Sequence, residues 1–125
     1  MPITQLEAEA WVAFAEGNSE QAVDYLRRAA DREAADGGES VAVPAREMLA
    51  DLLLEMKRPA ESLTAYQSVL KAAPNRFDAL LGAARAADTL GVAAQVGDYY
   101  RQLVAVAAAD ADRPEIETAR AYLRK

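Results

Sequence analysis

The chain has 125 residues, the size of a single domain, and a formal net charge of −6. It contains neither cysteine nor histidine, which excludes a disulfide framework and also thiolate, imidazole and zinc-finger chemistry. The acidic balance argues against nucleic acid and against anionic membrane surfaces as partners, because both attract basic proteins.

Turn residues divide the chain into seven expected helices. The first follows Pro2 and ends near Glu16, and the second runs from Ser19 to about Ala35. A loop is expected at 36–40, most simply a plain linker, with a flap over a neighbouring groove as the alternative. The other expected helices cover 44 to a break at 57–58, 59 to just before 74, 77–90, 92–109, and 114 onward after a cap at 110–112.

The chain also repeats itself. Residues 57–66 align without a gap with residues 91–100, at an offset of 34, and residues 17–26 form a third copy 40 residues before the first of these. Each copy places a small residue four positions before a large one. The small residues are Ala22, Ser62 and Val96, the large ones are Leu26, Tyr66 and Tyr100, and the small residues expected opposite them on the preceding helices are Ala10, Ala50 and Ala84.

This pattern resembles the tetratricopeptide repeat (TPR), whose period is 34 residues. The second and third copies are similar to uncharacterised bacterial TPR proteins. The resemblance implies a right-handed α-solenoid of three helix-turn-helix hairpins in one domain, 1–125. The repeats are expected at about 3–36, 43–76 and 77–110, with a capping helix at about 113–125. A generic helical bundle with chance spacing is the alternative.

The resemblance also implies a binding groove, because in this family the first helix of each hairpin lines the concave wall. The corresponding positions here are Glu7, Trp11, Phe14, Glu47, Asp51, Leu54, Glu55, Asp78, Leu81, Arg85 and Asp88. Most of their charges are acidic, and one end carries two aromatic rings. Such a wall suits a basic peptide with an apolar anchor. The family's cluster of Lys, Asn and Arg that clamps a terminal carboxylate is not matched.

Several alternatives stay open at this point. The acids at 47, 51 and 55 share one helix face, which is read first as a solvated face, then as part of a ligand site, and last as an enzyme or ion site. Trp11 is read either as core or as an interface anchor. We expect a non-catalytic protein-interaction scaffold with no cofactor or metal. The alternative is a self-associating segment of a larger assembly, including a homo-oligomer.

The location of the protein is not defined by the sequence. We find no run of about 18 apolar residues that would predict a transmembrane helix, and no signal-peptide pattern at the start. The absence of cysteine fits the cytoplasm and the periplasm equally well. We expect the cytoplasm, with a periplasmic location as the alternative if a signal peptide has been trimmed.

Overall fold

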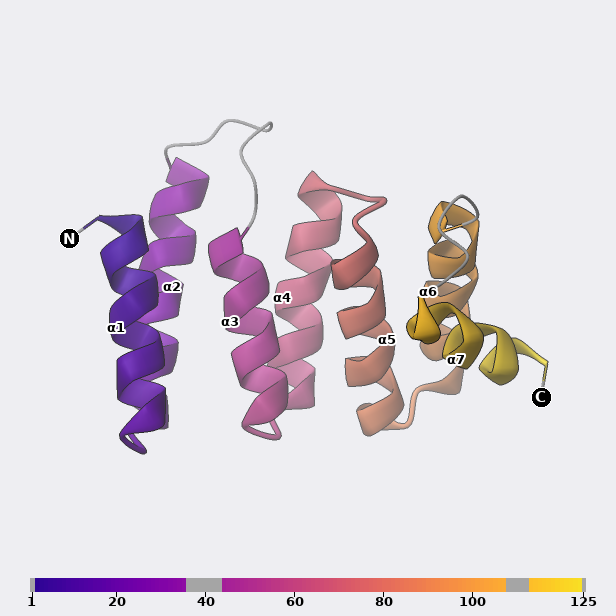
Figure 1. The fold of residues 1–125 in the computed structure, drawn as a ribbon, viewed down its shortest axis with the longest axis horizontal. Helices are drawn as coiled ribbons and strands as arrows, with labels where there is room; N and C mark the ends of the chain where they lie inside the picture. The colour runs from indigo at the N-terminus through magenta and orange to yellow at the C-terminus, as the bar shows by residue number, and fades with distance from the viewer. Residues whose placement is uncertain (1, 36–43, 108–112, 125) are drawn as a thin grey trace.

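A computed structural model describes residues 2–35, 44–107 and 113–124. Within these ranges the chain forms seven α-helices and no strand, which confirms the all-α class (Figure 1). The helices are α1 (Ile3–Ala15), α2 (Ser19–Ala35), α3 (Pro44–Glu55), α4 (Pro59–Ala72), α5 (Phe77–Leu90), α6 (Ala93–Val106) and α7 (Pro114–Leu123).

The helix boundaries agree closely with those expected from the turn residues, and the largest difference is at the end of α6. This helix was expected to reach residue 109 but ends at Val106, because Ala107 leaves the helical conformation with φ −88° and ψ 7°. The expected loop at 36–40 and the expected cap at 110–112 lie outside the described residues. In the described part, Arg113 precedes α7 as its N-cap, without a capping hydrogen bond from its side chain.

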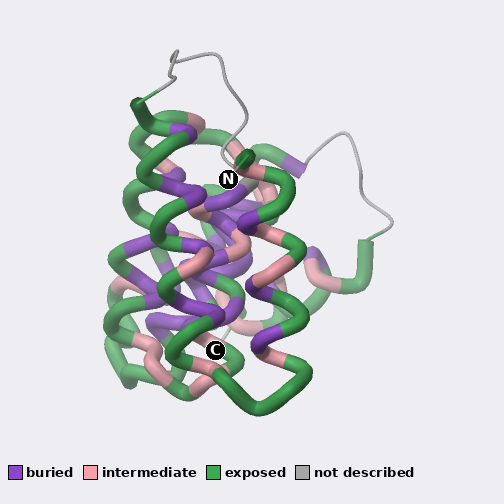
Figure 2. Tube along the Cα trace, turned by 90° about the vertical axis from the view of Figure 1, so that its left-hand side faces the viewer, coloured by how far each residue is buried: buried purple, intermediate pink, exposed green. Residues whose placement is uncertain are grey.

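The helices stand in a row in which each packs mainly against its neighbours in sequence (Figure 1). Tight turns join α1 to α2, α3 to α4 and α5 to α6, and α3 also touches α5. α7 packs on α6. Buried residues therefore lie along the inside of the row, and exposed ones cover its outside (Figure 2).

The expected pairs of small residues are buried in all three hairpins, each at most 1% exposed. In the middle hairpin the Ser62 hydroxyl donates a hydrogen bond of 2.7 Å to the carbonyl oxygen of Ala50, which joins α4 directly to α3. The large residues Leu26, Tyr66 and Tyr100 are also buried. The register predicted for the helix faces is therefore confirmed.

The three turns inside the hairpins share one backbone feature. Gly17, Lys57 and Gly91 occupy equivalent positions, and their φ angles are 85°, 62° and 79°. This left-handed conformation ends helices and normally belongs to glycine. This conformation is unfavourable for lysine, yet Lys57 adopts it. The middle hairpin therefore has the same turn without a glycine.

No helix in the described ranges is both long enough and apolar enough to cross a lipid bilayer.

Candidate binding site

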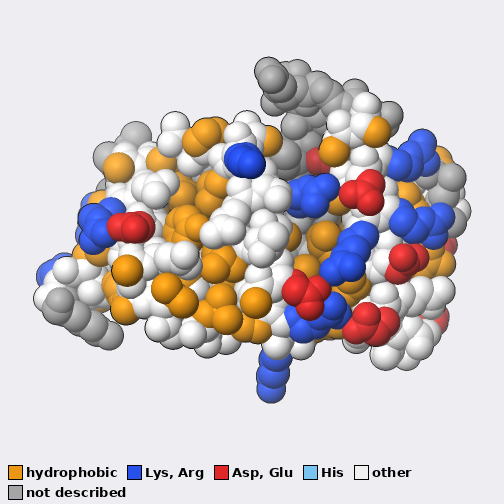
Figure 3. All heavy atoms as spheres, turned by 180° about the vertical axis from the view of Figure 1, so that it is seen from behind, with side chains coloured by type: hydrophobic (Ala, Val, Ile, Leu, Met, Phe, Trp, Pro, Cys, Tyr) orange, Lys and Arg blue, Asp and Glu red, His pale blue; other side chains and the backbone are white. Residues whose placement is uncertain are grey.

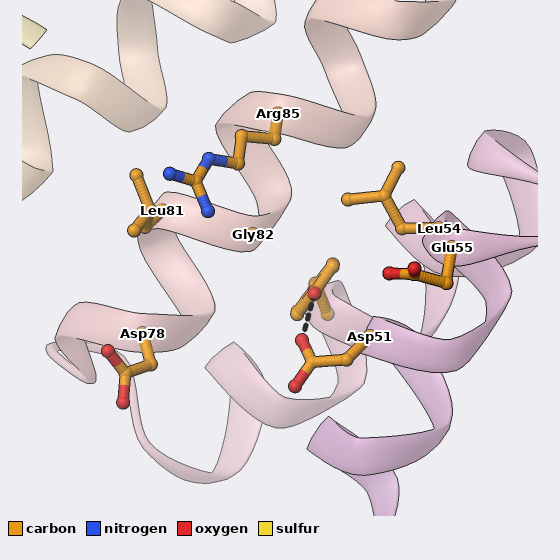
Figure 4. A pocket seen from close by; sticks show the side chains of 8 residues that line it. Asp51, Leu54, Glu55, Asp78, Leu81, Gly82 and Arg85 are labelled. Atoms are coloured by element: carbon orange, nitrogen blue, oxygen red, sulfur yellow. Dashed lines mark hydrogen bonds between the residues drawn. The ribbon is translucent and has the colours of Figure 1, made fainter. Parts of the chain in front are cut away.

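A hollow of about 400 Å³ opens between α3 and α5 (Figure 4). We call it the α3–α5 hollow. It is lined by Asp51, Leu54, Glu55, Tyr66, Asp78, Leu81, Gly82 and Arg85. Six of these residues are among the groove positions expected from the sequence, and the structure brings them together from two helices that are not adjacent in the chain.

The two remaining residues, Tyr66 and Gly82, fit closely against each other. Tyr66 comes from α4, is 2% exposed, and its hydroxyl donates a hydrogen bond to Asp51 Oδ1. A Cβ atom on Gly82 would lie 2.2 Å from Cζ of the Tyr66 ring. Glycine at position 82 therefore makes room for the tyrosine that holds Asp51.

Sequence reasoning assigned Tyr66 to the core and did not single out Gly82. A signal was present, because an isolated glycine inside a helical pattern often marks a close approach of another group. The identity of that group depends on which α4 residue faces α5, and only the packed helices reveal it.

Burial raises the pKa of the Asp51 carboxyl above its ordinary value, and the nearby carboxylates of Glu47 and Asp78 raise it further. The Tyr66 hydrogen bond and Arg85 act in the opposite direction. Burial and the bond to Asp51 also raise the pKa of Tyr66 far above its usual range. The hydroxyl therefore stays protonated and remains a donor at all physiological pH values.

Glu47 differs from the expectation of a solvated groove acid. It is 8% exposed, and its Oε2 accepts hydrogen bonds from Nε and Nη2 of Arg76, at 2.9 and 2.7 Å. This bond raises the pKa of Arg76. The prediction of three solvated acids thus holds only for Glu55, which is exposed. The Asp51 carboxyl is partly buried against Tyr66, and Glu47 is enclosed beside a cation that sequence reasoning had not placed there.

The charged residues that line the α3–α5 hollow differ in whether they already have a hydrogen-bond or ion-pair partner. Asp78 lies 3.5 Å from Arg113, and Asp51 is bonded to Tyr66. Glu55 and Arg85 are exposed and form no ion pair within the described residues. Three acids and one arginine leave a formal charge of −2 around a cavity whose walls include two leucines.

The other expected groove residues do not line this hollow. Glu7, Trp11 and Phe14 belong to α1, where the two rings meet edge to face with centroids 6.1 Å apart. Trp11 is 44% exposed, so it is not a core residue. Asp88 is exposed near the end of α5.

The opposite side of the molecule has a different arrangement of charge. There, basic and acidic side chains lie next to one another (Figure 3), and α2 is linked to α4 by Arg27–Glu61 at 2.9 Å and Arg58–Glu20 at 2.8 Å. These acids already have cationic partners. Among the described residues, most carboxylates that form no ion pair lie on α1, α3 and α5.

Within the described ranges, no three or more carboxylates come together in a way that could hold a metal ion. No family model matches this chain, and no curated protein matches it.

Proposed function

We propose that this chain is a non-catalytic scaffold that binds a basic peptide segment, with an apolar anchor, in the α3–α5 hollow. The proposal includes the architecture expected from the TPR resemblance, a right-handed solenoid of three hairpins with α7 as its cap. The neighbour-to-neighbour packing of the helices and the three equivalent turns support this architecture. In such an array α3 and α5 would belong to one concave wall.

The observation that carries the binding proposal is the composition of the hollow. Leu54 and Leu81 offer apolar contact, and Glu55 offers a carboxylate without an ion pair among the described residues. A lysine or arginine side chain can lay its methylene groups along leucines while its charge stays near a carboxylate. An apolar neighbour in the same peptide would supply the anchor.

Catalysis has less support from the same residues. Acid–base chemistry needs a group that can exchange a proton with a substrate. Asp51, the lining acid with a raised pKa, already accepts a hydrogen bond from Tyr66. Its role in the hollow is therefore to hold the tyrosine and to contribute negative charge.

The test is a screen of short synthetic peptides that differ in charge and carry one leucine or phenylalanine, followed by titration calorimetry. We expect the bound peptides to be rich in Lys and Arg. Glu55→Lys combined with Asp78→Lys should weaken their binding by at least about tenfold and reduce its dependence on salt. Asp24→Lys combined with Asp98→Lys is the matched control, because it changes the net charge by the same amount and both residues are exposed, on α2 and α6, away from the hollow.

Two results would contradict the proposal. One is enrichment of acidic or uncharged peptides in the screen. The other is an equal loss of affinity in the double variant of the hollow and in the Asp24→Lys, Asp98→Lys control, because a general change in net charge would then explain the effect.

A further inference from the structure

We propose that the outer side of α1 is a second docking surface, and that its partner is an amphipathic helix with Lys or Arg on both sides of its apolar stripe. We call this surface the α1 face. It consists of the exposed residues Thr4, Ala8, Trp11, Val12 and Ala15. None of them lines the α3–α5 hollow.

The α1 face lacks the cover that the other helices have. Each helix from α2 to α6 packs extensively on two neighbours, whereas α1 packs mainly on α2. Leu6, Ala10 and Ala13 are the buried residues of α1, and they account for only one side of it. Figure 2 looks at this end of the row, where the outward side of the nearest helix is exposed.

Two of the five side chains on the α1 face are large and apolar. Val12 is 52% exposed and Trp11 is 44% exposed, more than any other large hydrophobic residue in the described chain. A surface helix normally turns its apolar stripe toward the core and its polar residues toward water, so Trp11 and Val12 depart from this rule. Exposed apolar patches that contain tryptophan are typical of interaction sites.

At the other end of the row, α7 has a polar exposed side. α7 buries Ile116 and Ala119 against the array and exposes polar residues such as Glu117 and Arg124. A polar outer side is what a terminal helix needs in order to face water. The exposed apolar side chains of α1 therefore have no counterpart on the polar outer side of α7.

The acidic residues that border the α1 face indicate that its partner carries basic residues. At 100° per residue, Glu7 lies on one side of the face and Glu9 and Glu16 lie on the other. α1 contains no lysine or arginine, and within the described residues these three glutamates form no ion pair. A second copy would bring the same acids against each other, whereas a helix with basic borders would pair with them.

The experiment uses a synthetic helical peptide with a stripe of leucine and alanine bordered by lysines, and a matched peptide with glutamates in place of the lysines. Trp11 is the only tryptophan, so its emission reports directly on the α1 face. We expect the lysine peptide to shift that emission to shorter wavelength, and the glutamate peptide to leave it unchanged.

Variants separate the α1 face from general charge attraction. Val12→Glu should weaken binding of the lysine peptide by at least about tenfold, while Val106→Glu should not, because Val106 is an exposed valine on α6 that adds the same charge elsewhere. If circular dichroism shows that Val12→Glu disturbs the helices, Ala15→Glu replaces it as the test variant. Glu55→Lys with Asp78→Lys should leave this interaction unchanged, which keeps it distinct from the hollow.

The proposal is overturned if the lysine peptide produces no emission shift up to millimolar concentration. It is also overturned if the two peptides bind equally, or if Val12→Glu and Val106→Glu behave alike. Sedimentation that shows self-association of the chain, abolished by Val12→Glu, would assign the α1 face to a second copy and would equally overturn it.

Discussion

Gly82, Tyr66 and Asp51 form a unit of three residues from three helices. The absent side chain of Gly82 admits the Tyr66 ring, and the ring's hydroxyl holds the Asp51 carboxylate at the edge of the α3–α5 hollow. A buried tyrosine hydroxyl needs a hydrogen-bond partner. The position of the Asp51 carboxylate in the hollow therefore depends on the packing of one core residue, Tyr66.

Gly82→Ala should lower the free energy of unfolding by about 1–3 kcal/mol, although alanine normally favours a helix over glycine. The reason is the overlap of the new methyl group with the buried Tyr66 ring. Urea denaturation measures the change. Gly97→Ala is the control, because its Cβ would meet only the end of the Arg101 side chain at 3.4 Å, and it should stabilise the protein by up to about 1 kcal/mol. Equal effects of the two substitutions would contradict this account.

Asp51→Asn should remove the contribution of the Asp51 carboxyl to the pH dependence of the free energy of unfolding. The pKa of Asp51 in the folded protein is raised above its ordinary 3.8, so its stabilising contribution is complete below about pH 3.8 and is lost as the pH rises through the folded value. Asparagine keeps an oxygen for the Tyr66 hydroxyl and does not titrate. The stability of the original protein relative to Asp51→Asn should therefore fall as the pH is raised from acid toward neutral.

Urea denaturation over a series of pH values checks this expectation. Glu47, Asp78, Arg85 and Tyr66 also act on Asp51, but they are present in both proteins, so the difference isolates Asp51. A difference that is independent of pH, or one that grows toward neutral pH, would contradict the raised pKa.

At the scale of elements, a contact between two helices supports the start of α3. Glu33 of α2 is buried, and its carboxylate accepts a 3.0 Å hydrogen bond from the backbone N–H of Ala45 in the first turn of α3. It thus satisfies one of the free N–H groups at the start of α3. Burial raises the pKa of Glu33, while the bond to Ala45 lowers it.

The hairpin turns give a direct test at this scale. Lys57→Gly should stabilise the protein by about 1 kcal/mol, because position 57 has a left-handed φ of 62° that costs a side-chain-bearing residue more than glycine. The reciprocal change, Gly91→Lys, should destabilise it. A Cβ at Gly91 would meet nothing within 4 Å, so the cost there is purely conformational. Thermal or urea denaturation measures both, and a loss of stability in Lys57→Gly would show that the lysine side chain contributes more than the strain removes.

At the scale of the whole molecule, the core is divided along the row. One cluster of buried residues is centred on α4, α5 and α6, a second contains residues of α1, α2 and α3, and a third, smaller cluster also joins α1, α2 and α3. In arrays where units contact only their neighbours, stability is close to a sum of local terms. The two ends of this protein should therefore respond separately to damage.

Leu26→Ala should lower the free energy of unfolding by about 2–5 kcal/mol, since Leu26 is fully buried in the second cluster. Hydrogen exchange should show the loss of amide protection mainly in α1, α2 and α3. Leu80→Ala, in the first cluster, should concentrate the loss in α4, α5 and α6. A uniform loss over all helices in both variants would mean that the chain unfolds as one unit.

The sequence by itself determined the helices and their buried faces. Prolines, glycines and the spacing of small and large residues are local signals, so the helix bounds and the burial of the Ala50–Ser62 pair could be predicted without coordinates. The TPR resemblance supplied the expected groove positions of α3 and α5. Six of them line the α3–α5 hollow, whereas Glu47 and Asp88 do not.

Only the tertiary structure decided which groups are partners. It enclosed Glu47 beside Arg76, joined Asp51 to Tyr66 across the space left by Gly82, and left Trp11 and Val12 uncovered. These outcomes depend on the distance and rotation between helices, which determine whether two charges meet and whether a side chain is covered. Helical periodicity states which way a residue points, whereas the pairing of residues from different helices is a property of their packing.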